Sequence, residues 1–400
     1  MRIAFLTHEP FYPPSGGGSC EAVYLIQSML KACHEVEVFS PQIEDSRKVE
    51  EKFGIKIHPF QTFQLDRYTS FRNLKYLIYP FFQEREVRAF IKANPVDLIF
   101  SQHAISAVTA GRLKKKLRIP TVMNFLDHLT GFMETWPAWI APRSLISSLK
   151  RFEMSIPSRY EADGVLTVSD ELADRFRKTG YPREKLLPIY FGIDRDQFSQ
   201  VKLNPESKPS PPVIMMHGSF DKHHLGATAT EAVKVVHKEM PEARFRFVGR
   251  RTPVLNRFVR QLKQKMPELT IECPGFIPYN RIVEQLNEAS LGMVPYQESS
   301  GTHCAFIAKA VEYLAAGIPV VCTPLEGLRS YFQDEPLIRF SSFDGCQFGE
   351  DLLYWLKMPT SERIPLQKEA AAKIWTELDW KVICDRGVEF CEKIHSSSTA

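Results

Sequence analysis

The sequence lacks any apolar run that approaches the roughly 20 residues needed to cross a bilayer. Residues 1–7 look like a strand, and their apolar run is too short for the core of a signal peptide. The eight cysteines are scattered without a Cys-x-x-Cys pair, which disfavours a zinc site or a disulfide framework and favours a reducing compartment. We therefore expect a soluble cytoplasmic protein that at most lies peripherally on the inner face of the membrane.

A strong charge of either sign is also missing. The formal net charge is +4, and all of the excess lies in residues 1–200, which hold 27 Lys and Arg against 23 Asp and Glu. A nucleic-acid-binding protein would carry a more concentrated basic face, so we expect no nucleic-acid partner. The small surplus fits weak attraction to an anionic membrane surface or an anionic acceptor.

The motifs of the common nucleotide cofactors are not satisfied. Gly16, Gly17 and Gly18 follow the first expected strand, but no further glycine completes Gly-x-Gly-x-x-Gly and no acidic residue ends the second strand. A nicotinamide dehydrogenase is thereby disfavoured, and a Walker loop is absent. Three glycines before a helix that should begin near residues 19–21 still allow backbone N–H groups to approach an anion or a sugar.

Short apolar runs alternating with longer amphipathic stretches predict repeated βαβ units. Such continuous runs are typical of parallel strands that are covered on both faces. The pattern runs through the chain twice, so the fold class is α/β, with two Rossmann-like doubly wound domains. The expected strands are residues 3–6, 36–39, 97–100, 120–124, 165–168, 213–216, 244–248, 269–273, 291–294, 319–322 and 337–340.

The domain boundary is expected where residues 202–212 are rich in Pro, Ser and Lys. We predict an N-terminal acceptor domain over 1–200, a linker over 201–212 and a C-terminal donor domain over 213–360. Residues 361–400 should form two helices, near 366–378 and 380–394, which could cross back to the first domain. Aromatic residues gather at 71–82 and 131–142. These two runs could pack helices onto a sheet or form an apolar surface for an acceptor or a membrane.

Residues 301–323 are the most informative segment. They suggest a loop, a helix beginning near His303, a glycine cap at Gly317 and a buried strand. Lys309 and Glu312 are three residues apart and so share a helix face. The lysine and the helix N-terminus can neutralise a diphosphate, while the carboxylate can accept two hydrogen bonds from ribose hydroxyls. The other interpretation is an ordinary surface ion pair.

This segment resembles the donor-binding signature of GT-B glycosyltransferases, particularly family 4 and its relatives. Further resemblances follow in matching order at residues 16–18, 162–169, 191–198, 247–249 and 274–278. The resemblance implies two Rossmann-like domains facing a cleft. It also implies transfer of a sugar from a nucleoside diphosphate sugar to a carbohydrate or lipid-linked acceptor, in cell-surface polysaccharide or glycoconjugate synthesis.

Several donor-binding positions follow from the resemblance, and some depart from it. Glu312 would bind the ribose, but Cys304 stands where the family has the first of its two glutamates, which touches the donor sugar. Ser219 and His224 stand in place of the basic pair that holds the diphosphate. Neighbouring histidines and a lysine could take over this role, or could be solvated loop residues. The candidate donor-binding residues are Gly218, Ser219, Lys222, His223, His224, Phe276, Ile277, Thr302, His303, Cys304, Lys309 and Glu312.

The resemblance places the catalytic group after residues 120–124, where the chain has Asp127 and His128. An inverting enzyme would use Asp127 as the general base, whereas a retaining enzyme would use the group to orient the acceptor. We prefer Asp127, although the alignment of this loop leaves the choice open. The residues expected to line the acceptor side are His8, Glu9, Gly16, Gly17, Gly18 and His103.

Asp194 and Asp196 form an Asp-x-Asp pair of the kind that holds a divalent cation in the other major glycosyltransferase fold. Here the pair lies in the linker motif, remote in sequence from the donor segment, so we interpret it as structural. We expect neither an obligatory metal nor a cofactor. Two alternatives stay open, a nucleotide-sugar epimerase on the same fold and a non-catalytic partner that binds the sugar nucleotide. The replacement of the first glutamate by Cys304 keeps the second alternative open.

Overall fold

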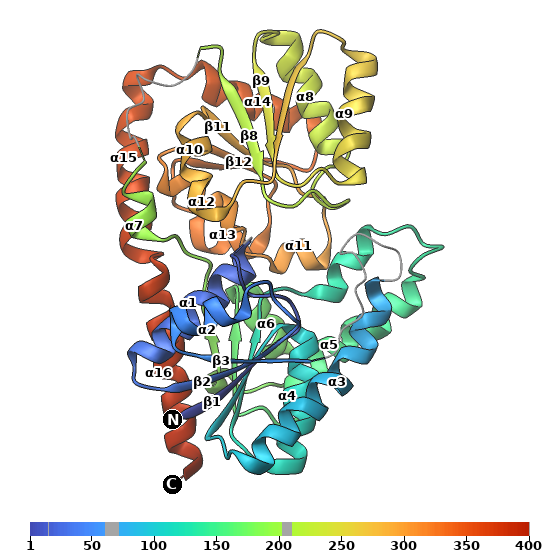
Figure 1. Ribbon diagram of the computed structural model, residues 1–400. Helices are drawn as coiled ribbons and strands as arrows, with labels where there is room; N and C mark the ends of the chain where they lie inside the picture. Colours follow the sequence, from blue (N-terminus) through green and yellow to red (C-terminus); the bar gives the residue numbers. More distant parts are fainter. Residues whose placement is uncertain (15, 61–71, 202–209, 400) are drawn as a thin grey trace. The chain divides into compact units, whose positions relative to one another are not determined.

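The computed structural model describes residues 1–14, 16–60, 72–201 and 210–399 (Figure 1). It divides into two compact units, which we describe separately. Unit 1 comprises Met1–Thr130, Arg143–Tyr190 and Lys381–Ala400, and unit 2 comprises Gly131–Pro142 and Phe191–Trp380. Most of the expected linker and part of the aromatic run 71–82 lie outside the described residues. Within the described part of the chain, no helix is both long and apolar enough to span a membrane.

Unit 1 is built on a seven-stranded parallel sheet of order β3-β2-β1-β4-β5-β6-β7 (Figure 1). The five strands expected for this half are present. The other two, β3 and β7, are edge strands that the sequence analysis missed. The strands are β1 Arg2–Thr7, β2 Glu35–Ser40, β3 Lys56–Pro59, β4 Leu98–Gln102, β5 Thr121–Phe125, β6 Gly164–Thr167 and β7 Leu186–Pro188.

Helices cover both faces of this sheet. Val87 and Ile91 of α3 and Leu113 of α4 pack with alternate residues of β1 on one face. On the other face, α16 approaches β6 so closely that a Cβ on Gly164 would lie 2.6 Å from the Phe390 ring. The helices of unit 1 are α1 Gly17–Lys31, α2 Ser46–Phe53, α3 Arg72–Ala93, α4 His103–Leu117, α5 Arg143–Arg159, α6 Asp170–Lys178 and α16 Trp380–Thr399. A short 3₁₀ turn, η2, spans Arg183–Lys185, and another, η1 Leu129–Thr135, begins in unit 1 and continues into unit 2.

Unit 2 repeats the same topology with a six-stranded parallel sheet of order β10-β9-β8-β11-β12-β13. All six expected strands are present. They are β8 Val213–His217, β9 Arg244–Val248, β10 Thr270–Gly275, β11 Leu291–Val294, β12 Val320–Cys322 and β13 Ile338–Phe340. The predicted fold class, two doubly wound Rossmann-like sheets, is therefore confirmed.

The helices of unit 2 lie on both faces of its sheet, with α8 and α14 on one face and α12 and α15 on the other (Figure 1). The C-terminal helices are longer than expected, since α15 begins at Thr360 and α16 continues to Thr399. The helices are α7 Arg195–Phe198, α8 Ala227–Glu239, α9 Pro253–Lys265, α10 Ile282–Asn287, α11 Ser300–Cys304, α12 Ala308–Ala315, α13 Glu326–Phe332, α14 Gly345–Lys357 and α15 Thr360–Glu377, with a 3₁₀ turn, η4, at Tyr279–Arg281.

Two glycines one helical turn apart bring α14 into close contact with α8. A Cβ on Gly345 would lie 2.5 Å from the Cβ of Glu231, and one on Gly349 would lie 2.6 Å from the Cβ of Val235. Glycine in a helix interior costs roughly 0.5–1 kcal/mol relative to alanine. The close approach of the two helices explains why glycine is nevertheless used here.

Replacing Gly349 by alanine should therefore destabilise the protein despite the better helix propensity. We expect the free energy of unfolding to fall by about 1–3 kcal/mol, because the new methyl group overpacks the helix contact. The matched control is Gly387→Ala in α16, where the nearest atom to the added Cβ is the flexible Leu25 Cδ2 at 3.3 Å. This control should be neutral or gain up to about 1 kcal/mol. Denaturant titration of both variants measures the difference, and equal effects would contradict the packing argument.

Candidate donor-binding and catalytic sites

The order of the strands reverses between β8 and β11 in unit 2. In open α/β sheets, ligands bind beyond the carboxyl ends of the strands at such a point. Gly218 follows β8 with a φ of 104°, a conformation that favours glycine. A Cβ on Gly218 would lie 3.5 Å from the Lys309 Nζ. Gly218, the glycine after the first strand of this unit, therefore lies directly beside Lys309 of the segment 301–323.

Lys309 is buried on α12 at this point. Its Nζ donates a hydrogen bond to the Tyr296 hydroxyl at 2.8 Å and lies 5.0 Å from the centre of that ring. Burial lowers the pKa of Lys309 to about 8, although the charges of Glu312 and Asp221 act in the opposite direction. A bound anion would further stabilise the charged form, so the site is suited to a phosphate group.

Glu312 lies one turn further along α12 and is also buried, with 6% of its surface exposed. Its Oε2 is hydrogen-bonded to the Nε2 of His217 at the end of β8. Lys309 and Glu312 are thus buried residues with other partners, rather than an exposed pair. His217 was not predicted from the sequence; its one signal is a polar residue that ends an apolar strand immediately before Gly218.

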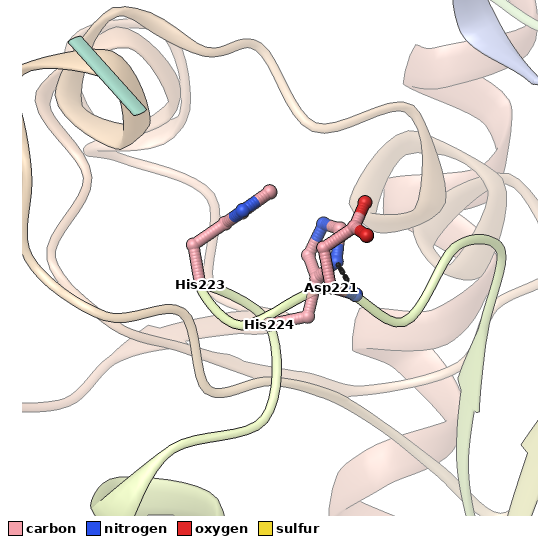
Figure 2. Close-up of side chains that lie close together, drawn as sticks. All are labelled: Asp221, His223 and His224. Atoms are coloured by element: carbon pink, nitrogen blue, oxygen red, sulfur yellow. Dashed lines mark hydrogen bonds between the residues drawn. The ribbon is translucent and has the colours of Figure 1, made fainter. Parts of the chain in front are cut away.

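The loop after β8 brings together Asp221, His223 and His224 (Figure 2). His224 is buried and His223 is half-buried, so neither imidazole is fully solvated. The two rings are 3.9 Å apart, and the His224 ring lies 4.5 Å from that of Tyr296. The histidines therefore belong to the same cluster as Lys309, whose hydroxyl partner is Tyr296. Lys222, in contrast, is exposed.

The cluster offers one ligand atom from each of the three residues within 4.8 Å of one another, the spacing of a metal site. However, the Nδ1 of His224 accepts a hydrogen bond of 2.9 Å from the Asp221 backbone N–H, the dashed line in Figure 2. The proton of a neutral His224 must then be on Nε2. Nε2 can then donate to a phosphate oxygen. It could bind a metal only if the proton moved to Nδ1, and that would break the hydrogen bond from the Asp221 N–H. The geometry, with the Lys309 ammonium nearby, favours an anion over a divalent cation.

The prediction that a helix begins near His303 is wrong. Instead, α11 begins at Ser300 and ends at Cys304, and the chain is extended at Ala305 before α12 begins. The start of α11 is fixed by a reciprocal cap in which the Ser299 hydroxyl accepts from the Thr302 N–H and the Thr302 hydroxyl accepts from the Ser299 N–H. The His303 N–H donates to the Ser299 carbonyl at 3.0 Å. The N–H groups of Thr302 and His303 are therefore used within α11 and do not form a free helix N-terminus.

The other donor-side residues have distinct environments. Cys304 is fully buried, whereas Phe276 is 44% exposed at the end of β10, with the Arg250 guanidinium carbon 5.3 Å from its ring centre. Gly275 has a φ of 93°, which turns the chain before Phe276 and Ile277. An exposed aromatic ring paired with a guanidinium offers a flat surface for a nucleotide base. Ser219 is half-buried.

The Asp194 carboxylate has a structural role. It accepts hydrogen bonds from the backbone N–H groups of Asp196 at 3.0 Å and Gln197 at 3.2 Å, and so caps α7. This is the role expected of an aspartate at a helix N-terminus.

Unit 1 gathers its own candidate residues at the carboxyl ends of β1 and β4. The His8 and His103 rings meet edge to face at 4.8 Å, and Glu9 lies 3.9 Å from His8. A Cβ on Gly18 would lie 2.9 Å from the Leu126 side chain and 3.2 Å from the His103 ring, so the close approach requires glycine. Helix α1 begins at Gly17, two residues earlier than expected, and Gly16 precedes it as the cap.

His103 has a φ of 71° at the junction of β4 and α4. Such strain in a residue other than glycine is found preferentially at functional sites.

Beneath this loop lies Glu21, a fully buried carboxyl group that the sequence analysis missed. Its Oε2 accepts hydrogen bonds from Gln102 at 3.0 Å and Asn124 at 2.9 Å, and Gln102 also donates to the Gly18 carbonyl. Burial raises the pKa of Glu21 to about 8, opposed by these two hydrogen bonds and reinforced by the charge of Asp127. Glu21 is therefore predominantly protonated at neutral pH and links three strand-end segments of unit 1.

Asp127 and His128 differ in accessibility. Asp127 is partly exposed, whereas His128 is 1% exposed and its Nδ1 lies 3.3 Å from the Arg175 guanidinium. The His128 Nε2 lies 3.9 Å from buried Glu153, which accepts the Leu129 and Thr130 N–H groups at 2.8 Å each. Burial raises the pKa of Glu153 to about 7. His128 is thus held inside unit 1, and Asp127 is the better placed of the two to reach an acceptor.

Replacing Glu21 by glutamine should flatten the pH dependence of stability. Between pH 4.5 and about 8 the unfolded state ionises this carboxyl while the folded state keeps its proton, so wild-type stability falls as pH rises. Glu21→Gln keeps an oxygen that accepts from Gln102 and Asn124 but cannot ionise. Its melting temperature relative to wild type should therefore increase from pH 5 to pH 8. Glu51→Gln, at an exposed position on α2, is the control and should show no such trend; a parallel trend in both variants would contradict the assignment.

Comparisons with known proteins agree with this arrangement. Residues 15–197 match the sequence profile of Glycosyltransferase Family 4, and residues 211–350 match that of the glycosyl transferases group 1. The chain is 28% identical over 295 residues to a protein of Escherichia coli K12 named as the colanic acid biosynthesis glycosyltransferase WcaL. That alignment covers 72% of this chain and 68% of the relative.

Two solved structures show the same fold at low sequence identity. Sucrose-phosphate synthase from Thermosynechococcus elongatus has a TM-score of 0.77 at 16% identity, covering 99% of this chain and all of that one. The Anabaena protein HepE (Alr3699), in complex with UDP and glucose, has a TM-score of 0.71 at 17% identity, covering 98% of this chain and 99% of HepE. The chain is therefore a glycosyltransferase of the GT-B fold that resembles family 4 in its first half and the group 1 glycosyl transferases in its second.

Proposed function

We propose that the protein transfers a hexosyl group from a nucleoside diphosphate sugar to a carbohydrate or lipid-linked acceptor in polysaccharide synthesis. The observation that carries this proposal is the pair of buried residues on α12, Lys309 and Glu312, at the switch point of unit 2. The colanic acid relative supports the polysaccharide context, and HepE, with UDP and glucose bound, supports the donor class.

The donor is held by groups of complementary chemistry. The Lys309 ammonium and the Nε2–H of His224 donate to the diphosphate, and the Glu312 carboxylate accepts from the ribose hydroxyls. The base lies against Phe276 and the backbone of Ile277. These residues supply the positive charge and hydrogen bonds that the departing diphosphate requires, so we expect no obligatory metal and no cofactor.

The acceptor residues are assigned to unit 1. The acceptor hydroxyl oxygen forms a bond to the anomeric carbon while the bond from that carbon to the diphosphate oxygen breaks. In an inverting reaction the hydroxyl proton passes to Asp127; in a retaining reaction it passes to the leaving diphosphate and Asp127 orients the acceptor. His8, Glu9 and His103 contribute further hydrogen-bonding groups on the same side of unit 1.

Helix α5 of unit 1 carries a surface suited to an anionic membrane. Leu145 and Phe152, seven residues apart and thus on one face, are 47% and 39% exposed. The Arg159 guanidinium lies over the Phe152 ring at 5.3 Å. The remaining basic residues of the helix are Arg143, Lys150 and Arg151, and its one acidic residue, Glu153, is buried. Exposed apolar side chains surrounded by basic ones favour a peripheral contact with acidic lipids.

Two variants should separate donor binding from transfer. Glu312→Ala should weaken nucleoside diphosphate binding at least about tenfold, because it removes charge-assisted hydrogen bonds to ribose. Asp127→Asn should lower kcat by roughly 10²–10⁴-fold and leave the donor Kd nearly unchanged. Calorimetry measures binding, and nucleoside diphosphate release measures transfer, with the donor first selected by a thermal-shift screen.

Unchanged nucleotide affinity in Glu312→Ala would contradict the donor site, and full turnover in Asp127→Asn would exclude an essential base. Incubation with donor alone provides a further control. An isomerised sugar would identify an epimerase rather than a transferase.

The surface of α5 is tested with lipid vesicles. The wild-type protein should sediment with vesicles containing phosphatidylglycerol and should bind vesicles of phosphatidylcholine alone much less. The double variant Leu145→Ser/Phe152→Ser should bind the acidic vesicles several-fold more weakly, because it removes the exposed apolar side chains and keeps the basic ones. Equal sedimentation of the variant and the wild type would exclude α5 as the contact surface.

A further inference from the structure

His217 ends β8 between two side chains of α12. Its Nε2 is hydrogen-bonded to the Glu312 Oε2, and its Nδ1 lies 2.9 Å from the Tyr313 hydroxyl. The His217 and Tyr313 rings meet edge to face at 4.9 Å. His217 is 5% exposed, so water does not compete strongly for these bonds. The imidazole thus links two consecutive side chains of the donor-binding helix.

Tyr313 is itself fixed to the sheet. Its hydroxyl donates to the Met215 carbonyl of β8 at 2.8 Å. Its ring lies over Gly292 of β11, where an added Cβ would be 2.3 Å from the ring. The tyrosine is therefore held against β11 through Gly292 and against β8 through Met215, and its orientation is set by both strands.

The hydrogen-bond inventory fixes the direction of each bond. Because the Tyr313 hydroxyl has one proton and gives it to Met215, it must accept the proton of the His217 Nδ1. Nε2 and the Glu312 Oε2 then face one another and must share a proton, since two lone pairs would repel. The carboxylate of Glu312 is consequently oriented by its hydrogen bond to the His217 imidazole at the end of β8, rather than by its own rotamer preference.

We propose that His217 is a positioning residue that fixes the Glu312 carboxylate so that its Oε1 accepts hydrogen bonds from the ribose of the donor. This inference rests on the proposed role of Glu312 in donor binding. His217 occupies one oxygen and sets the plane of the carboxylate, and the other oxygen is presented to the two vicinal hydroxyls. A consequence is selectivity for ribonucleotides over nucleotides that lack these hydroxyls.

Two substitutions of His217 test the roles of its two ring nitrogens separately. The side-chain amide nitrogen of glutamine can stand near the position of Nε2, and that of asparagine near the position of Nδ1. His217→Gln therefore keeps a donor to Glu312 and loses the bond to Tyr313. His217→Asn does the reverse. Tyr313→Phe is the matched control, because it removes the tyrosine bonds and leaves His217 beside Glu312.

The test compares affinities for a ribonucleotide and its 2′,3′-dideoxy counterpart by calorimetry. The probe is UDP or GDP, whichever the wild-type protein binds more tightly. Wild type should prefer the ribonucleotide by about tenfold or more, the contribution of charge-assisted hydrogen bonds. His217→Gln and Tyr313→Phe should keep this preference within about threefold, whereas His217→Asn should lose most of it. Melting temperatures of all variants are measured in parallel.

A purely structural role for His217 predicts a different result. His217→Asn would then weaken both nucleotides equally and keep the preference, which would overturn the inference. Retention of the full preference in both histidine variants would overturn it as well. The proposed function fails separately, if the wild type shows no preference for the ribonucleotide or if Glu312→Ala leaves that preference intact.

Discussion

The burial of a lysine and a glutamate on the eight-residue helix α12 is the constraint around which unit 2 is organised. Removing ionisable groups from water is costly unless each finds a partner. The partners come from different segments, His217 for Glu312 and Tyr296 for Lys309. Since β8 ends at His217 and β11 ends just before Tyr296, the two parallel strands must be adjacent for both charges to be accommodated. The site therefore depends on the strand order, and the buried charges tie α12 to both strands.

Unit 1 also buries an ionisable group near the ends of its strands, in this case a single carboxyl group. Glu21 is buried under the glycine loop and holds Gln102 and Asn124, which lie at the ends of β4 and β5. The Glu21 Oε1 and the Asn124 Oδ1 are both buried without a hydrogen-bond partner among the described residues. The raised pKa of Glu21 means that this carboxyl keeps a proton at neutral pH and can donate as well as accept a hydrogen bond. In each unit, then, a buried carboxyl group connects the ends of the strands at the point where ligands bind to this class of fold.

The parts of the structure that sequence reasoning found are those with a strong periodic signal. Each central strand is buried on both faces, so a continuous apolar run marked it. The edge strands β3 and β7 are short, contain prolines and are only partly buried, so they gave no such run. The break between α11 and α12 was missed because Ala305, Phe306 and Ile307 carry no helix-breaking residue type. The start of α11 was also misplaced, because it depends on the reciprocal cap between Ser299 and Thr302. His217 and Glu21 were missed because their importance comes from partners about 80 to 100 residues away in sequence.

Two departures from the family pattern, Ser219 and His224, affect the charge of the cluster around Lys309. Ser219 and His224 stand in place of the basic pair of the family pattern, which leaves Lys309 as the buried lysine of the cluster. Burial lowers the pKa of Lys309 to about 8, so its ammonium form is less strongly favoured at neutral pH than that of an exposed lysine. A diphosphate bound here, as proposed, would supply negative charge and raise this pKa, so that binding and protonation would reinforce one another. Under the proposed function, the charge of Lys309 would therefore be stabilised most when the donor is bound.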